Sequence, residues 1–171
     1  PRLVDGELDL LLGAFLAQPH EGVETRMLMN VEMTVFCCRD NPLTRLRGLE
    51  PSHLEGHQWV IYQRDRQVAE RIALYCRDHL LPAPRVAMEI DSLIACFHVV
   101  RGTRLLTTAT RLVRSLAENA GLVELPLAEP IWRFQSGAWY RRSMRNHSIL
   151  KKAIGMVEEL VANAMIHSPQ E

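Results

Sequence analysis

Residues 85–110 read RVAMEIDSLIACFHVVRGTRLLTTAT, and this stretch decides the class of fold. Residues 85–90 have the composition of a strand, and Asp91 or Ser92 then caps the helix that follows. Residues 105–108 indicate a second short strand. A strand, a helix and a strand in this order predict a parallel strand pair joined by a right-handed crossover.

The same alternation of periods extends outward on both sides of this stretch. Apolar spacing predicts strands at 8–15, 31–38, 58–62, 85–90, 105–108, 122–127 and 131–134, and helices at 51–55, 66–80, 92–102, 110–121 and from 146. Val31, Met33, Val35 and Cys37 share one face, which predicts a half-buried strand. The alternation as a whole predicts an α/β fold. Residues 23–29 and 131–139 lack nearby helical partners, so they are candidate connections between two lobes.

Composition narrows the class of function. The chain has 171 residues, 20 Lys and Arg against 20 Asp and Glu, and an apolar fraction of 47%. A formal charge of zero argues against a broad basic surface that binds nucleic acid. Four cysteines make no disulfide scaffold, which favours a reducing cytoplasm. No apolar run approaches the roughly 20 residues that span a bilayer, so we expect no membrane segment.

Motifs for catalysis are missing from the sequence. It contains no phosphate-binding loop, dinucleotide fingerprint, serine nucleophile elbow or C-x-x-C pair, so we predict no enzyme and no cofactor. His53 and His57 flank Glu55, but this spacing favours a solvated corner over a metal site. We interpret the four cysteines as buried structural thiols rather than as a redox switch. The basic cluster at 141–152 favours a solvated face over a contact with an anion or a neighbouring domain.

Five segments resemble LysR-type transcriptional regulators, and their order and spacing carry the resemblance. The first is Leu3-Val4-Asp5-Gly6-Glu7-Leu8-Asp9-Leu10-Leu11, a helix end followed by a Leu-Asp-Leu strand. The others are Val35-Phe36-Cys37-Cys38-Arg39-Asp40-Asn41-Pro42-Leu43, Glu50-Pro51-Ser52-His53-Leu54-Glu55-Gly56-His57, Gly102-Thr103-Arg104-Leu105-Leu106-Thr107-Thr108-Ala109 and Trp139-Tyr140-Arg141-Arg142. In the fourth segment, Arg104 stands where the family usually has a second glycine, and Ala109 where it has a proline.

The resemblance implies an effector-binding domain with the two-lobed periplasmic-binding-protein-like (type 2) fold and two hinge strands. It places residues 1–28 and 134–171 in lobe I and residues 29–133 in lobe II. Segments 23–29 and 131–139 then become the hinge. The resemblance further implies that the winged helix-turn-helix and the opening unit of lobe I lie outside this sequence, so that lobe I is incomplete at its N-terminus.

The effector site is expected in the interlobe cleft, at the carboxyl ends of strands and at helix N-termini. Ser92 and Thr108 would donate hydrogen bonds to a small polar or anionic effector, and Phe15 and Tyr62 would form apolar walls. The predicted ligand-binding residues are Ala14, Phe15, Tyr62, Gln63, Asp91, Ser92, Thr107 and Thr108.

The function implied is a cytoplasmic sensor that binds a small metabolite and passes the signal to DNA through an oligomer rearrangement. The resemblance implies a homodimer or homotetramer, DNA contact only through the absent N-terminal winged helix-turn-helix, and no membrane partner. The apolar helix at 92–101 suits a central core position or a subunit contact. The alternatives are a solute-binding receptor of a transporter and an enzyme on the same fold.

Overall fold

The computed structural model describes residues 2–15, 17–62 and 67–166, with the side chains of 164–166 excepted. Its strands are β1 (Leu10–Ala14), β2 (Val23–Cys38), β3 (Gln58–Tyr62), β4 (Arg85–Ile90), β5 (Leu106–Thr110), β6 (Leu122–Glu124) and β7 (Trp132–Arg141). Its α-helices are α1 (Gln67–Asp78), α2 (Leu93–Val100), α3 (Arg114–Asn119) and α4 (Ser148–Ile166). Short 3-10 helices cover Pro42–Arg45, Pro51–Leu54, Arg111–Val113 and Arg142–Met144.

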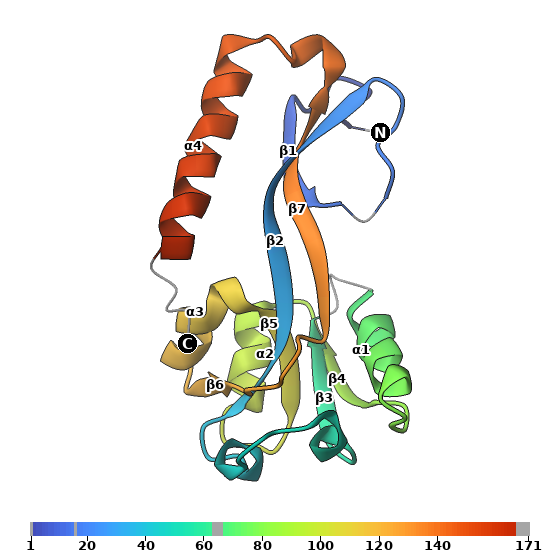
Figure 1. Ribbon diagram of the computed structural model, residues 1–171, viewed down its shortest axis with the longest axis vertical. Helices are drawn as coiled ribbons and strands as arrows, with labels where there is room; N and C mark the ends of the chain where they lie inside the picture. Colours follow the sequence, from blue (N-terminus) through green and yellow to red (C-terminus); the bar gives the residue numbers. More distant parts are fainter. Residues whose placement is uncertain (1, 16, 63–66, 167–171) are drawn as a thin grey trace. The chain divides into compact units, whose positions relative to one another are not determined.

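The strands form one mixed sheet in the order β1-β7-β2-β5-β3-β4, with β6 paired to β2 off this path (Figure 1). β3 lies parallel to both β4 and β5, so the two strands of residues 85–110 run parallel as predicted. They do not form a pair, because β3 lies between them. β1 is antiparallel to β7, and β2 is antiparallel to β5 and β6. The fold is therefore α/β, as the alternation of strand and helix predicted.

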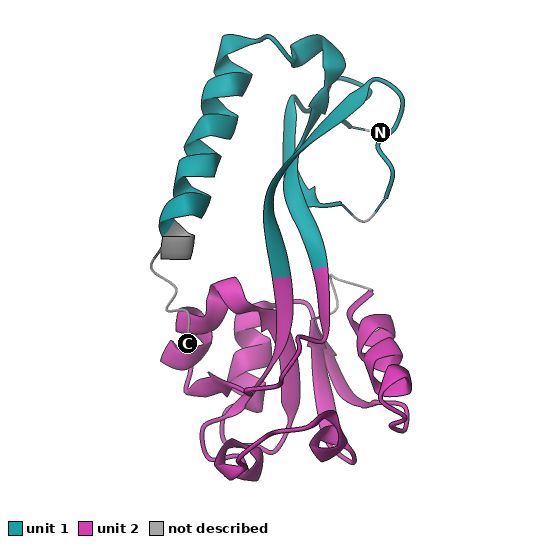
Figure 2. Cartoon of the chain, viewed as in Figure 1, with its two compact units in different colours: residues 1–31, 134–171 teal, residues 32–133 magenta. Residues whose placement is uncertain are grey.

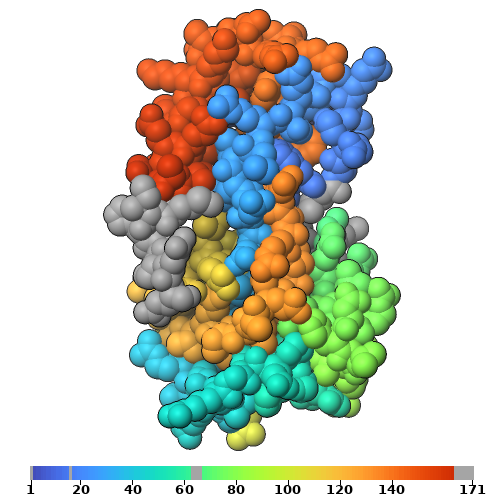
Figure 3. All heavy atoms as spheres, in the orientation of Figure 1, coloured from blue at the N-terminus to red at the C-terminus, as the bar shows by residue number. Residues whose placement is uncertain are grey.

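The chain divides into two compact units (Figure 2). Unit 1 comprises residues 1–31 and 134–171, and unit 2 comprises residues 32–133. The segments predicted as connections, 23–29 and 131–139, fall almost entirely in β2 and β7. These long strands lie side by side, blue against orange, and contribute residues to both units (Figure 3).

Unit 2 has helices on both faces of its part of the sheet. On one face, Val35, Trp59 and Ile61 pack with Ile72 and Cys76 of α1. On the other face, a second cluster joins strand residues to α2 and α3: Phe36, Val60, Cys96, Phe97, Val100, Ala109, Ala117 and Leu122. The half-buried strand predicted at 31–38 is wrong in this respect, because every residue from Met33 to Cys38 is buried. Helices on both sides of a sheet bury both faces of its central strands.

Unit 1 packs one face of its strands against α4. Its core cluster is Ala138, Leu150 and Ile154, bordered by the half-buried Leu10, Leu28, Tyr140 and Met144. The apolar stripe predicted for α4 is only partly buried, since Leu160 exposes 67% of its surface. The buried strand predicted at 8–15 is also wrong in extent and in burial. The strand covers Leu10–Ala14, and Leu11 and Leu12 are 45% and 49% exposed.

Arg141 fixes the opening segment of unit 1 and departs from the solvated basic face that we predicted. Its guanidinium donates to the carbonyl oxygens of Leu3 (3.1 Å) and Leu8 (2.8 Å) and to the Asp9 carboxylate (2.5 Å). The turn between them needs Gly6, whose φ of +79° favours glycine. Sequence spacing missed this role because the carbonyl acceptors lie more than 130 positions away.

Candidate functional site

Three parallel strands of unit 2 end at the same edge of the sheet. β3 ends at Tyr62, β4 ends at Ile90 directly before Asp91 and Ser92, and β5 ends at Thr110. Tyr62 is half-buried and packs with Ile90 and Leu93 against the α2 cluster. In open α/β sheets, ligands bind outside the carboxyl ends of parallel strands, so this edge is the candidate site of unit 2.

The N-terminus of α2 lies at this edge, immediately after β4. Ser92 is its N-cap in an extended conformation, and its Oγ accepts a hydrogen bond from the Ala95 N–H at 3.3 Å. The hydroxyl keeps its own proton for donation. The first-turn N–H groups and the helix dipole favour an anionic or hydrogen-bond-accepting group. Asp91 is exposed beside them and places a carboxylate at the rim.

Thr107 and Thr108 lie inside β5, on opposite faces of the sheet. Thr107 is paired with Phe36 and Thr108 with Val35, which themselves belong to the two different core clusters. Both side chains are buried, and within the described chain neither Oγ1 has a hydrogen-bond partner. Because adjacent strand residues point in opposite directions, the structure does not bring these two hydroxyls together.

Thr110 is the residue of β5 at the edge itself, and it is not among the predicted ligand-binding residues. We expected the strand to end at 108, but pairing with β2 carries it to Thr110, which lies opposite Met33. The Thr110 Oγ1 accepts from the Leu112 N–H at 3.0 Å and so caps the following turn. This confirms Thr110 as the cap expected at the start of the helix predicted at 110–121, although it was not predicted as a ligand-binding residue.

A network of ion pairs begins at Arg111, the residue that follows Thr110. Arg111 bonds to Glu32 and, at 2.8 Å, to Glu124. Arg114 reaches the other oxygen of Glu124 at 2.6 Å, and Arg133 reaches Glu32 at 2.9 Å. Glu124 is only 9% exposed, and its carboxylate is shared by two guanidinium groups. The network ties the end of β5 to β2, β6 and β7 within unit 2.

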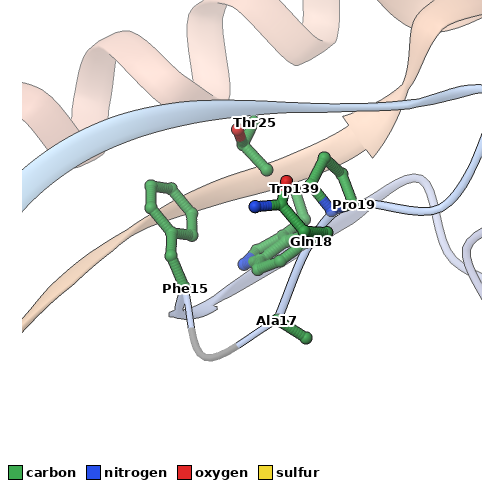
Figure 4. A pocket seen from close by; sticks show the side chains of 6 residues that line it. All are labelled: Phe15, Ala17, Gln18, Pro19, Thr25 and Trp139. Carbon is green, nitrogen blue, oxygen red and sulfur yellow. The ribbon is translucent and has the colours of Figure 1, made fainter.

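Two of the predicted residues, Ala14 and Phe15, lie in unit 1. Ala14 ends β1, and Phe15 lies edge-on to Trp139 with ring centroids 5.2 Å apart and an interplanar angle of 79°. Gly137 makes room for this pair, since a Cβ there would lie 2.7 Å from the Phe15 ring and 2.1 Å from the Arg26 carbonyl oxygen. The open cavity at this point is about 510 Å³ and uncharged, and is lined by Phe15, Ala17, Gln18, Pro19, Thr25 and Trp139 (Figure 4).

Gln63 lies outside the described residues. His53 uses its Nδ1 in the capping of the turn at Glu50, as a solvated corner requires. Within the described ranges no group of three or more His, Cys, Asp or Glu side chains is placed to hold a metal ion, and no described helix is long and apolar enough to cross a membrane.

The cysteines are all free and buried. Burial, with a smaller contribution from neighbouring Cys38, raises the pKa of the Cys37 thiol to about 12. Burial also raises the pKa of the Cys76 and Cys96 thiols. A thiol with a raised pKa forms little thiolate, so these side chains act as apolar core residues.

Comparison with known families gives a match over nearly the whole chain. The family model described as LysR substrate binding domain matches residues 1–162. No curated protein matches the sequence significantly.

Solved structures share the fold at low sequence identity. The C-terminal domain of a probable LysR family transcriptional regulator from Rhodococcus sp. RHA1 is 22% identical, with a TM-score of 0.73 over 91% of this chain and 77% of that one. The regulatory domain of CcmR from Synechocystis PCC6803, in complex with 2-PG, is 15% identical, with a TM-score of 0.75 over 95% and 77%. A putative transcriptional regulator from Vibrio parahaemolyticus is 17% identical, with a TM-score of 0.79 over 96% and 75%.

Proposed function

The chain belongs to the LysR substrate-binding domain family, and from that premise we propose that unit 2 binds the effector at the carboxyl ends of β3, β4 and β5. As a member of this family it is the effector-binding regulatory domain of a LysR-family transcriptional regulator, and it is not an enzyme. Family membership also favours the regulator over a solute-binding receptor of a transporter.

The N-terminus of α2, capped by Ser92, is the observation that carries this proposal. It combines the first-turn N–H groups of the helix, a hydroxyl and the half-buried Tyr62 beside the α2 cluster. This set suits a small polar or anionic effector whose acceptor atoms face the helix and whose apolar part rests on the aromatic ring. The Synechocystis CcmR domain, which has the same fold, is described in complex with 2-PG.

The other predicted residues are proposed in supporting roles. Phe15 and Ala14 would form an apolar wall on unit 1, and Gln63, Asp91, Thr107 and Thr108 would complete the polar set. Since Thr107 and Thr108 are buried, their hydroxyls reach a ligand only if β5 opens locally. Thr110 joins this set as the hydroxyl at the edge itself.

The proposed signal is a shift between two arrangements of the domain. We propose the two-lobed periplasmic-binding-protein-like form, with residues 1–28 and 134–171 in one lobe, 29–133 in the other and two hinge strands. An effector moves this equilibrium only if it binds the two arrangements with different affinity. A homodimer or homotetramer in the cytoplasm would pass the shift to an N-terminal winged helix-turn-helix. Ile94, on α2, is 54% exposed and suits a subunit contact.

The test is a thermal-shift screen of the chain against aromatic acids, amino acids and small phosphorylated acids, followed by titration of each anionic hit. Ser92→Asp retains an N-cap but adds a negative charge, so we expect anionic hits to bind at least about tenfold more weakly while the melting temperature stays close to wild type. Ser52→Asp, an exposed position elsewhere in unit 2, is the matched control. Equal affinity in Ser92→Asp and wild type would overturn the site.

A further inference from the structure

The ion-pair network of unit 2 holds more positive than negative charge. Arg114 binds the Glu124 carboxylate through both its Nε (2.8 Å) and its Nη2 (2.6 Å), so these two charges balance. Arg111 also reaches Glu124, at 2.8 Å, and it binds Glu32 as well. Arg133 binds the other oxygen of Glu32 at 2.9 Å. Three guanidinium groups therefore share two carboxylates, which leaves one net positive charge in the network.

This net charge falls on Arg111 and Arg133, which share the single carboxylate of Glu32. Arg111 donates through Nε and Nη1, and Arg133 through Nε. Within the described chain the remaining Nη atoms of both side chains have no acceptor. The side chains are 44% and 60% exposed, so a solute can reach them. The planar N–H donors of a guanidinium match the oxygen atoms of a carboxylate or phosphate group.

The pair lies at the same edge of the sheet as the α2 N-terminus but at a different strand. Arg111 follows Thr110 at the end of β5, and Glu32 precedes Met33, which is paired with Thr110. In the sheet β3 lies between β5 and β4, and Ser92 follows β4. Two spacings of about 4.8 Å therefore separate the strand end at Arg111 from the one at Ser92, roughly 10 Å in all.

We propose that Arg111 and Arg133 bind a small oxyanion, the phosphate or carboxylate group of a metabolite, at a second anion site of unit 2. With Glu32, the bound anion completes a set of two cations and two anions. Glu32 and Arg133 are the first and the last residue of unit 2, on β2 and β7 (Figure 2). The anion is thus held where both long strands leave unit 2, which suits a regulatory ligand. The site goes beyond the effector site proposed above, since it uses neither Ser92 nor Tyr62.

Glu32 limits the affinity of this site for anions. Its carboxylate occupies donors of both arginines and repels a second negative charge. Glu32→Gln keeps the size of the side chain and removes the charge, so we expect anions to bind at least about tenfold more tightly. A residue that only held the structure together would not strengthen binding when it is replaced.

NMR titration tests the site through the Nε–Hε signals of the arginine side chains. Inorganic phosphate and acetate are added separately at constant ionic strength. The signals of Arg111 and Arg133 should shift and saturate with at least one of the two anions. Arg47, an exposed arginine elsewhere in unit 2, should show no saturable shift and is the internal control. No saturable shift of Arg111 and Arg133 with either anion would overturn the proposal.

Removing one cation should weaken binding. Arg133→Gln leaves Arg111 as the single binding arginine, so the affinity for either anion should fall at least about tenfold. Because Arg133 is 60% exposed, the far-ultraviolet circular dichroism of this variant should match wild type. Arg47→Gln makes the same charge change and should leave the affinity within about twofold. Equal affinities in Arg133→Gln and Arg47→Gln would contradict the site.

The charge change at Glu32 needs its own control. Glu55→Gln removes one negative charge at an exposed position before β3, at the opposite end of that strand from the site. We expect its affinity for either anion to stay within about twofold of wild type, against a tenfold gain in Glu32→Gln. Unchanged or weaker binding in Glu32→Gln would contradict the proposal. Ser92→Asp should leave the Arg111 titration unchanged, so this site and the effector site can fail separately.

Discussion

Unit 2 and unit 1 differ in how many faces of their strands are covered by helices. Unit 2 has helices on both faces, and its two core clusters contain Trp59, Phe36, Phe97 and Ile72 with 1% exposure or less. In unit 1, α4 covers one face of the sheet. Among the described residues its core cluster has three buried members. The difference teaches that the candidate site lies at the edge of the closely packed unit 2, whereas the described part of unit 1 exposes more of its apolar surface.

The largest effect is expected from opening the unit 2 core. Phe97 is fully buried and packs against Phe36, with ring centroids 6.2 Å apart. Phe97→Ala should lower the free energy of unfolding by about 3–5 kcal/mol through lost burial and a cavity. Denaturant unfolding followed by circular dichroism measures the loss, and a cost below about 1 kcal/mol would contradict a closely packed unit 2.

The matching change in unit 1 should cost less. Ile154 is 4% exposed but belongs to a small cluster beside an open strand edge. Ile154→Ala should lower the free energy of unfolding by about 2 kcal/mol, at the low end for a buried isoleucine, because neighbours at an open site can relax into the space. If the same denaturant titration gives a loss equal to that of Phe97→Ala, the contrast between the units fails.

The charge network of unit 2 gives the next effect. Glu124→Gln removes the carboxylate shared by Arg111 and Arg114 while keeping the shape of the side chain. Because Glu124 is 9% exposed, we expect a loss of about 1–3 kcal/mol. Glu32→Gln is the control, since Glu32 is 30% exposed and should lose less. Unfolding curves at low and high salt check both, and equal losses would contradict the ranking.

The smallest effect should have the opposite sign. Thr107 is fully buried, and within the described chain its hydroxyl has no partner. Thr107→Val replaces this hydroxyl with a methyl group of similar size, so the chain should become more stable by up to about 1 kcal/mol. A loss of stability in thermal unfolding would show that the hydroxyl has a bonding partner after all.

How much the sequence predicted also differs between the units. In unit 2, the alternation of strands and helices, the parallel direction of the strands around residues 85–110 and a cap at Asp91 or Ser92 were predicted, because each depends on local periodicity and turn chemistry. The burial of residues 33–38 on both faces of the strand was not predicted, because it depends on helices that are distant in the sequence.

In unit 1, local pattern was a poorer guide. The run Leu10-Leu11-Leu12 indicated a buried strand, yet Leu11 and Leu12 are 45% and 49% exposed in the described structure, since a hydrophobic run does not show which elements pack on it. Arg141 was read as solvated because its acceptors are distant backbone carbonyl groups. In the candidate site, Thr110 was predicted as a helix cap but not as a site residue, because the end of the strand was placed two residues early. Tertiary pairing sets such boundaries, not propensity.

Residue-resolved hydrogen exchange on the dilute 171-residue chain tests the contrast between the units most directly. Amides of β3 and β5, covered by helices on both faces, should exchange slowest, and the amides of β1 should exchange at least about tenfold faster. Equal protection of β1 and β3 at a concentration where the chain is monomeric would contradict the account.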